Sequence, residues 1–361
     1  MEIKTRLFWY RTLQTTKRQT MSTNGKYGTI NGGQMRVEMG GCRGSLPVAG
    51  TQYTRYGGNT TAIRVISECL PPDMALVVDG GTGFLPLSMR AMQQGARRLM
   101  ILLTHHHHDH SQGFFIAPAT FIPTIQKTVW GPVELGVGPE KAFRMLMAPP
   151  FHPVDFSSVA GSFSFKDLPR PRNYVILFHP LGGGPLLLPV DKFEKIKRGN
   201  GIVRFAPDNC QKLTECLLVR MFYSNHPERT ICYRFEELPT GKVFVFLTDN
   251  ENTAALPTPF KAHLENARLL MMDGQYSENV YHSRTKGFGH ATPSFCVQTA
   301  IACGARQLGL THHDPTSSDD YLEKTILVEG QAELARCSEN TEVPIALTNV
   351  FLCADGQVIE V

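Results

Sequence analysis

Residues 102–113 read Leu102-Leu-Thr-His-His-His-His-Asp-His-Ser-Gln-Gly113, a stretch unlike any other in this 361-residue chain. It places five histidines and one aspartate within six residues, directly after the apolar run Leu99 to Leu103, which we expect to be a buried strand. A solvated histidine tract would belong at a terminus or in low-complexity sequence. Imidazole and carboxylate together are the ligands that Zn²⁺, Mn²⁺ and Fe²⁺ prefer. The stretch therefore predicts a metal site at the end of a strand.

The spacing within this stretch indicates two ions rather than one. The pattern is His-x-His-x-Asp-His, filled by His105, His107, Asp109 and His110. Residues two apart in an extended segment point to one side, so the first two histidines can bind one ion. Once the chain turns into a helix, the aspartate and the last histidine point elsewhere and can hold a second ion. The intervening histidines fall on the opposite side, and we assign no metal to His106 and His108.

Later strand ends provide the remaining candidate ligands. His226 follows an expected strand at 217–223 and would complete the shell of the first ion. Asp249 follows a strongly apolar strand at 242–247, and its two oxygens can bridge two cations. A short strand at 307–310 leads to His312 and His313, one of which would complete the second ion's shell.

These motifs resemble those of the metallo-β-lactamase superfamily. The resemblance implies an α/β fold, the αββα four-layer sandwich, with two sheets face to face and helices outside. Arg43-Gly44-Ser45-Leu46-Pro47 and Arg55-Tyr56-Gly57-Gly58-Asn59-Thr60 also look like the N-terminal signature of the phosphodiesterase branch. That branch contains tRNase Z-like enzymes and phosphodiesterases of cyclic nucleotides and phosphoribosyl cyclic phosphates.

The resemblance also implies roles for single residues. It favours His312 as the ligand of the second ion and leaves His313 as the fallback beside it. Asp79, at the end of an apolar strand, would orient the histidine loop by hydrogen bonding rather than bind metal. We expect Glu251 to support the site in a similar way.

Residues 286–293, Lys-Gly-Phe-Gly-His-Ala-Thr-Pro, resemble the tRNase Z-like loop whose histidine lies near the leaving oxygen. His290 is therefore the candidate general acid, and Asp109 is the second residue that we expect to be essential for catalysis. We further expect an aspartate at the end of the preceding strand, Asp273, to interact with this loop.

The function that follows is a metal-dependent phosphodiesterase. Two divalent cations, Zn²⁺ or Mn²⁺, would lower the pKa of a bridging water towards neutrality, and the resulting hydroxide would attack phosphorus. We expect a small cyclic phosphate as the substrate, either a cyclic nucleotide or a phosphoribosyl cyclic phosphate, and no organic cofactor. The alternative is a tRNase Z-like endonuclease that processes tRNA 3′ ends, with nucleic acid as its partner.

Charge and composition argue against two classes of partner, nucleic acid and membranes. Net charge is +4, but residues 1–33 hold six basic residues against one acidic residue, so the remainder is close to neutral. A near-neutral body argues against a broad nucleic-acid-binding face. Nine scattered cysteines without Cys-x-x-Cys spacing predict reduced thiols in a cytoplasmic protein. No apolar run approaches the roughly 20 residues that span a bilayer, so we expect no membrane partner.

The chain divides into a tail and one catalytic domain. Residues 1–33 predict a basic disordered tail, with an organellar presequence or a start at Met21 as alternatives. Residues 34–361 would form the catalytic domain. Within it, residues 168–213 read as a Gly/Pro-rich insertion with a basic run from Lys192 to Arg198, which we interpret as a lid or a contact in a homodimer.

Overall fold

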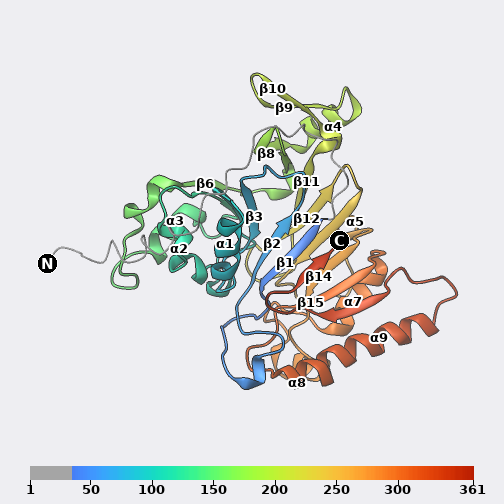
Figure 1. Cartoon of the computed structure of the whole chain (residues 1–361). Coiled ribbons are helices and arrows are strands. Elements are labelled where there is room, and N and C mark those ends of the chain that lie inside the picture. Colours follow the sequence, from blue (N-terminus) through green and yellow to red (C-terminus); the bar gives the residue numbers. More distant parts are fainter. Residues whose placement is uncertain (1–34) are drawn as a thin grey trace. The chain divides into compact units, whose positions relative to one another are not determined.

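The computed structural model describes residues 35–361, which contain two large mixed sheets with helices on their outer faces (Figure 1). The predictions for residues 1–33 fall outside these described residues. Two sheets with flanking helices confirm the sandwich that the sequence predicted.

The first sheet has seven strands in the order β17-β1-β2-β3-β4-β5-β6. The pairs β17–β1, β1–β2 and β2–β3 are antiparallel, whereas β3, β4, β5 and β6 run parallel to one another. The strands are β1 (Arg36–Gly41), β2 (Ala62–Ile66), β3 (Met74–Val78), β4 (Arg98–Leu102), β5 (Gln126–Gly131), β6 (Phe163–Asp167) and β17 (Val358–Glu360).

The second sheet has eight strands in the order β16-β15-β14-β13-β12-β11-β7-β8. Neighbours from β8 to β13 pair antiparallel, whereas β13 to β16 run parallel. The strands are β7 (Tyr174–His179), β8 (Gly183–Pro189), β11 (Leu217–Tyr223), β12 (Ile231–Glu237), β13 (Lys242–Leu247), β14 (Leu269–Asp273), β15 (Gln307–Thr311) and β16 (Asn349–Leu352).

The sequence of β4 is apolar from Leu99 to Leu102 because both faces of this strand are buried. Met100 and Leu102 point into the core between the sheets, together with residues of the second sheet such as Phe244. Leu99 and Ile101 point to the opposite face and pack under the outer helices. Because successive side chains alternate between the faces and both faces are buried, the strand is apolar at every position after Arg98.

Each sheet has its own outer helices. The first sheet is covered by α1 (Phe84–Gln93), α2 (Pro118–Phe121) and α3 (Pro139–Leu146). The second is covered by α5 (Thr258–Leu264), α7 (Pro293–Ala302) and α9 (Val328–Glu339), with short helices α6 (Glu278–Val280) and α8 (Asp319–Tyr321). Single π-helical turns span Tyr281–Thr285 and Leu322–Leu327. Short 3-10 helices span Thr51–Tyr53, His108–His110, Gln112–Phe115, Phe156–Ser158, Ala160–Ser162, Pro171–Asn173 and Leu213–Glu215.

Residues 168–213 contribute both to the sheet and to a separate element. β7 and β8 are the edge of the eight-stranded sheet, whereas α4 (Val190–Arg198) and the hairpin of β9 (Ile202–Ala206) and β10 (Asn209–Lys212) lie outside it. A small apolar cluster holds α4 and the hairpin on the sheet, with Phe193 and Val203 packed against Val175. The end of the sheet thus has its own hydrophobic support.

All nine cysteines lie in the described part of the chain, and none of them forms a disulfide there. Among residues 35–361, no helix combines the length and the apolar content needed to cross a bilayer.

Candidate metal centre

Asp79, directly after β3, fixes the histidine loop that follows β4. Its carboxylate accepts hydrogen bonds from the backbone N–H of Thr104 at 2.7 Å and from the hydroxyl of Thr104 at 2.8 Å. The same carboxylate lies 2.8 Å from Nδ1 of His110, in a fully buried pair. Because Nδ1–H is donated to Asp79, Nε2 is the nitrogen of His110 that faces the site. Asp79 is therefore hydrogen-bonded to both ends of the loop that it was predicted to orient.

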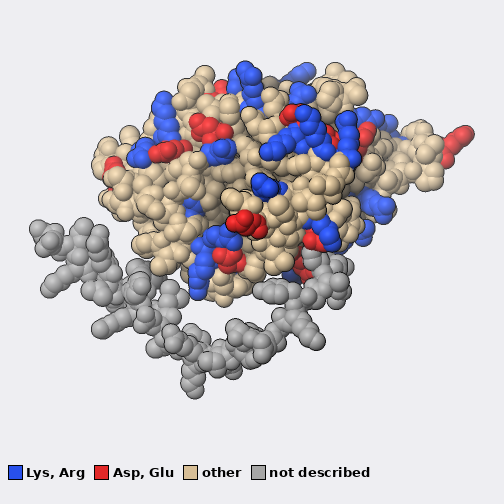
Figure 2. All heavy atoms as spheres, turned by 90° about the horizontal axis from the view of Figure 1, so that it is seen from above, with Lys and Arg blue, Asp and Glu red and all other residues tan. Residues whose placement is uncertain are grey.

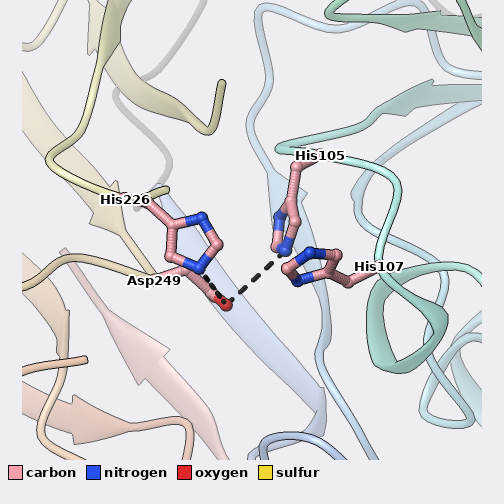
Figure 3. Close-up of side chains that lie close together, drawn as sticks. All are labelled: His105, His107, His226 and Asp249. Carbon is pink, nitrogen blue, oxygen red and sulfur yellow. Dashed lines mark ion pairs between the residues drawn. The ribbon is translucent and has the colours of Figure 1, made fainter. Parts of the chain in front are cut away.

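The first group of candidate ligands is His105, His107, His226 and Asp249 (Figure 3). One ligand atom from each lies within 4.8 Å of all the others. Nε2 of His105 is 3.6 Å from Oδ2 of Asp249, and Nε2 of His226 is 3.9 Å from that oxygen. These separations are too long for hydrogen bonds but suit groups arranged around a common centre.

The protonation state of these histidines fits a metal site. Burial lowers the pKa of His105 well below its usual range, and burial also lowers the pKa of His107 and of His226. All three imidazoles are therefore neutral near pH 7, as metal ligands must be. Nε2 of His105 is buried and has no hydrogen-bond partner among the described residues. A cation bound there would satisfy this nitrogen.

The second group is Asp109, His110 and His312. Nε2 of His312 lies 3.1 Å from Oδ2 of Asp109 and 3.2 Å from Nε2 of His110. Two ring nitrogens and a carboxylate oxygen thus face one another across this gap. Imidazole and carboxylate are ligands that transition-metal ions prefer, so this donor set also fits a metal ion.

Asp249 joins the two groups. Its Oδ2 faces the first group, while its Oδ1 lies 3.2 Å from Nε2 of His110 and 3.4 Å from Nε2 of His312 in the second. Thr248 supports the carboxylate with a 2.7 Å hydrogen bond to Oδ1. One oxygen is thus directed at each group, which is the geometry a bridging carboxylate requires.

Left-handed backbone conformations occur at three of these strand ends. Asp79, Asp249 and His312 have φ values of 62°, 47° and 60°. A positive φ is uncommon for residues other than glycine and costs free energy, and such strain concentrates at functional sites. Here it turns the chain sharply after β3, β13 and β15, so that each side chain projects into the same space.

His290 lies between the two groups. Its Nδ1 is 2.7 Å from Oδ2 of Asp273, so the predicted contact between Asp273 and this loop is present. Although burial opposes protonation, the Asp273 carboxylate raises the pKa of His290 to about 9. The His290 ring stacks on His312 with centroids 4.9 Å apart, and one nitrogen of the His290 ring falls within a third group with Asp249 and His312.

Glu251 holds the loop that carries His290. Its carboxylate accepts hydrogen bonds from the N–H groups of Gly287 at 3.1 Å and Gly289 at 2.7 Å, and from the hydroxyl of Tyr281. Glu251 therefore supports the site through this loop. His313 belongs to none of the three groups found among residues 35–361, and its Nε2 lies 3.0 Å from the carbonyl oxygen of Cys353.

Four supporting contacts were not predicted from the sequence. Thr104 bonds Asp79, Oε1 of Gln275 lies 3.2 Å from Nδ1 of His312, and the N–H of Ser45 donates to Asp109. Glu228 lies 3.3 Å from both Nε2 of His107 and Nδ1 of His226. Thr104 and Glu228 lie within two residues of a predicted ligand, whereas Ser45 and Gln275 are far from the ligands they contact in sequence. Spacing alone therefore gave no signal for Ser45 and Gln275.

Neither a protein-family model nor a curated protein matches this sequence. Solved structures do match. Unliganded yeast PDE1 has a TM-score of 0.57 and 12% identity, covering 91% of this chain and 99% of its own. The metallo-β-lactamase fold protein YhfI from Bacillus subtilis has a TM-score of 0.55 and 17% identity, covering 91% and 100%. A long-form RNase Z from yeast has a TM-score of 0.52 and 13% identity, covering 91% and 42%. At these identities the likeness is one of fold, and the chain has the metallo-β-lactamase fold.

Proposed function

We propose that this protein is a phosphodiesterase that uses two divalent cations, Zn²⁺ or Mn²⁺, to hydrolyse a small cyclic phosphate. The observation that carries the proposal is the position of Asp249, whose two oxygens face two separate groups of histidines and a further carboxylate. The metal ligands are His105, His107, Asp109, His110, His226, Asp249 and His312.

The chemistry follows from two neighbouring cations and the residues around them. Such cations lower the pKa of a water molecule towards neutrality and neutralise the negative charge of a phosphate. Asp79 keeps His110 in the tautomer that leaves Nε2 free. Asp273 binds Nδ1 of His290, which leaves Nε2 of His290 to donate a proton to the departing oxygen.

A phosphodiester substrate is supported over other substrates of this fold by the His290 loop. Hydroxide attack on a lactam or thioester would account for the metal ligands. It would give no role to His290 or to the hydrogen bonds by which Glu251 holds the His290 loop. The fold shared with PDE1, a phosphodiesterase, agrees with this choice. Residues 168–213 remain a proposed lid or homodimer contact.

The second candidate is a tRNA 3′-end endonuclease, favoured by the fold shared with yeast RNase Z and by the basic residues of α4. However, α4 also contains Asp191 and Glu194. Figure 2 shows basic and acidic side chains interspersed on the face seen from above. A long RNA would be better held by an uninterrupted basic surface.

A substrate panel tests both candidates. Purified protein loaded with Zn²⁺ or Mn²⁺ is assayed on cyclic nucleotides, cyclic sugar phosphates, linear dinucleotides and precursor tRNA, with Asp109→Ala and Asp249→Ala as inactive controls. We expect hydrolysis of a cyclic phosphate that both substitutions abolish. Cleavage of precursor tRNA without activity on cyclic phosphates would favour the endonuclease instead.

A further inference from the structure

Three exposed apolar side chains belong to loops that are connected to the candidate metal centre by hydrogen bonds. Leu46, Leu135 and Phe288 expose 63%, 94% and 61% of their surface. Exposing large apolar side chains is unfavourable, and a group of them beside a polar site typically marks a binding surface. Each belongs to a loop that is hydrogen-bonded to the metal centre or to a segment that supplies a ligand.

Phe288 is held in place from both sides. Its neighbours Gly287 and Gly289 have φ values of 91° and 94°, and both donate their N–H groups to Glu251. The N–H of Phe288 itself donates to the Thr285 carbonyl at 3.0 Å. The backbone of this loop is therefore fixed while the phenyl ring is left in solvent.

The loop lies directly against a candidate ligand. A Cβ atom added to Gly289 would lie 2.5 Å from Cδ2 of His226, so the backbone next to Phe288 touches that imidazole. His290 follows one residue later and faces both groups. Phe288 is thus within reach of a substrate whose phosphate occupies the metal centre.

Leu46 and Leu135 come from two other loops. Leu46 follows Ser45, whose N–H bonds Asp109. Leu135 has a φ of 49°, and its neighbour Glu134 accepts a 3.3 Å hydrogen bond from the N–H of Arg229 in the loop that carries His226. The backbone of Leu135 is strained and its side chain is exposed, so packing in the core does not explain this residue.

We propose that Phe288 stacks on the nucleobase of the substrate, with Leu46 and Leu135 as apolar walls. The inference rests on the proposed function and narrows its substrate to a nucleotide rather than a sugar phosphate without a base. When the phosphate lies at the cations, the rest of the substrate must extend towards the rim. An aromatic ring there binds the flat face of a base and offers little to a polar sugar.

The test compares substrates that differ only in the base. They are the 3′,5′- and 2′,3′-cyclic phosphates of adenosine and of methyl riboside, which has a methoxy group in place of adenine. We expect Phe288→Ala to raise KM for the adenosine substrate about tenfold, with kcat little changed, because a stacked base is lost. KM for methyl riboside should stay unchanged.

Two further variants sharpen the comparison. Phe288→Trp should restore the KM for the adenosine substrate, since an indole also stacks. Phe151→Ala, at another phenylalanine that is 88% exposed, should change neither substrate. Equal effects of Phe288→Ala on both substrates, or none on either, would overturn the inference.

Binding is also read without turnover, as the quenching by AMP of the tryptophan emission of Phe288→Trp beyond that of the wild-type protein, which itself contains two tryptophans. If the wild-type protein hydrolyses no phosphodiester, the proposed phosphodiesterase function fails. The emission still decides the inference in that case: quenching supports a base stacked at this position, and unchanged emission overturns it.

Discussion

The backbone N–H of Ser45 donates a 2.7 Å hydrogen bond to Oδ2 of Asp109, the oxygen that also lies 3.1 Å from Nε2 of His312. Arg43, two residues earlier, is fully buried and ties this segment to the chain beyond His312. It donates to the carbonyl of Ser317 at 2.7 Å and to Oδ1 of Asp319 at 3.1 Å. The Arg-Gly-Ser segment thus positions one wall of the metal centre.

Arg43→Met should therefore destabilise the protein strongly. The substitution leaves the buried Asp319 carboxylate without its cation, which typically costs about 3–5 kcal/mol of unfolding free energy. Urea denaturation measures the change. Arg55→Ala is the matched control, because Arg55 pairs with Asp320 and Glu323 at the surface, and such pairs contribute about 0–1 kcal/mol. Equal stability of the two variants would contradict the role of Arg43.

Cations should stabilise the wild-type protein. A ligand that binds only the folded state adds about 4 kcal/mol when its concentration is a thousand times its Kd. We expect Zn²⁺ or Mn²⁺ to raise the Tm of chelator-treated protein, and metal analysis to find two ions per chain. Asp249→Asn, which weakens both shells at once, should reduce the shift and the metal content. An equal shift in wild type and variant would mean that the cation binds elsewhere.

His290→Ala should lower kcat by about 10² to 10⁴ if His290 is the general acid. Metal content, measured by elemental analysis on the same preparation, should stay at the wild-type level. Asp273→Asn should lower kcat less, because it removes the carboxylate that orients His290 but keeps the imidazole. Loss of one ion from His290→Ala would show that this histidine is a ligand instead.

His263 should make the protein sensitive to acid. Burial lowers the pKa of His263 to about 3, whereas an unfolded histidine titrates near its ordinary value of 6.5. Between these values the unfolded state binds the extra proton, so the unfolding free energy falls as the pH decreases, by about 1.4 kcal/mol per pH unit. His263→Phe should flatten this dependence between pH 6.5 and 4. Identical slopes in urea titrations of both proteins would rule out the effect.

Much of the fold was predictable because its strands are buried on both faces. The bounds of β11 and β13 agree with the predicted runs at 217–223 and 242–247. β5 was missed because Gln126 and Lys127 begin it and prolines surround it. β7 was assigned to the insertion because the Gly182–Gly184 turn follows it, although pairing with β11 places it in the sheet.

The ligands of the candidate site could be predicted from the sequence, but fewer of the residues that hydrogen-bond to those ligands could be. All seven predicted ligands are brought together, because the strands of both sheets that precede them end at one edge of the sandwich. Ser45 lies 64 residues from Asp109, and Gln275 lies 37 residues from His312, so only the folded chain reveals these contacts. The choice between His312 and His313 is visible in the backbone, where a φ of 60° turns His312 inward.

The pairing of β1 with β17, which aligns Arg36 with Glu360, has a consequence for biosynthesis. One edge of β1 stays open until Val358–Glu360 has been synthesised and can pair with it. Contacts between such distant residues form slowly, and an open strand edge invites association with other chains. Before β17 pairs with it, the open edge of β1 is therefore a place where nascent chains are expected to associate with one another.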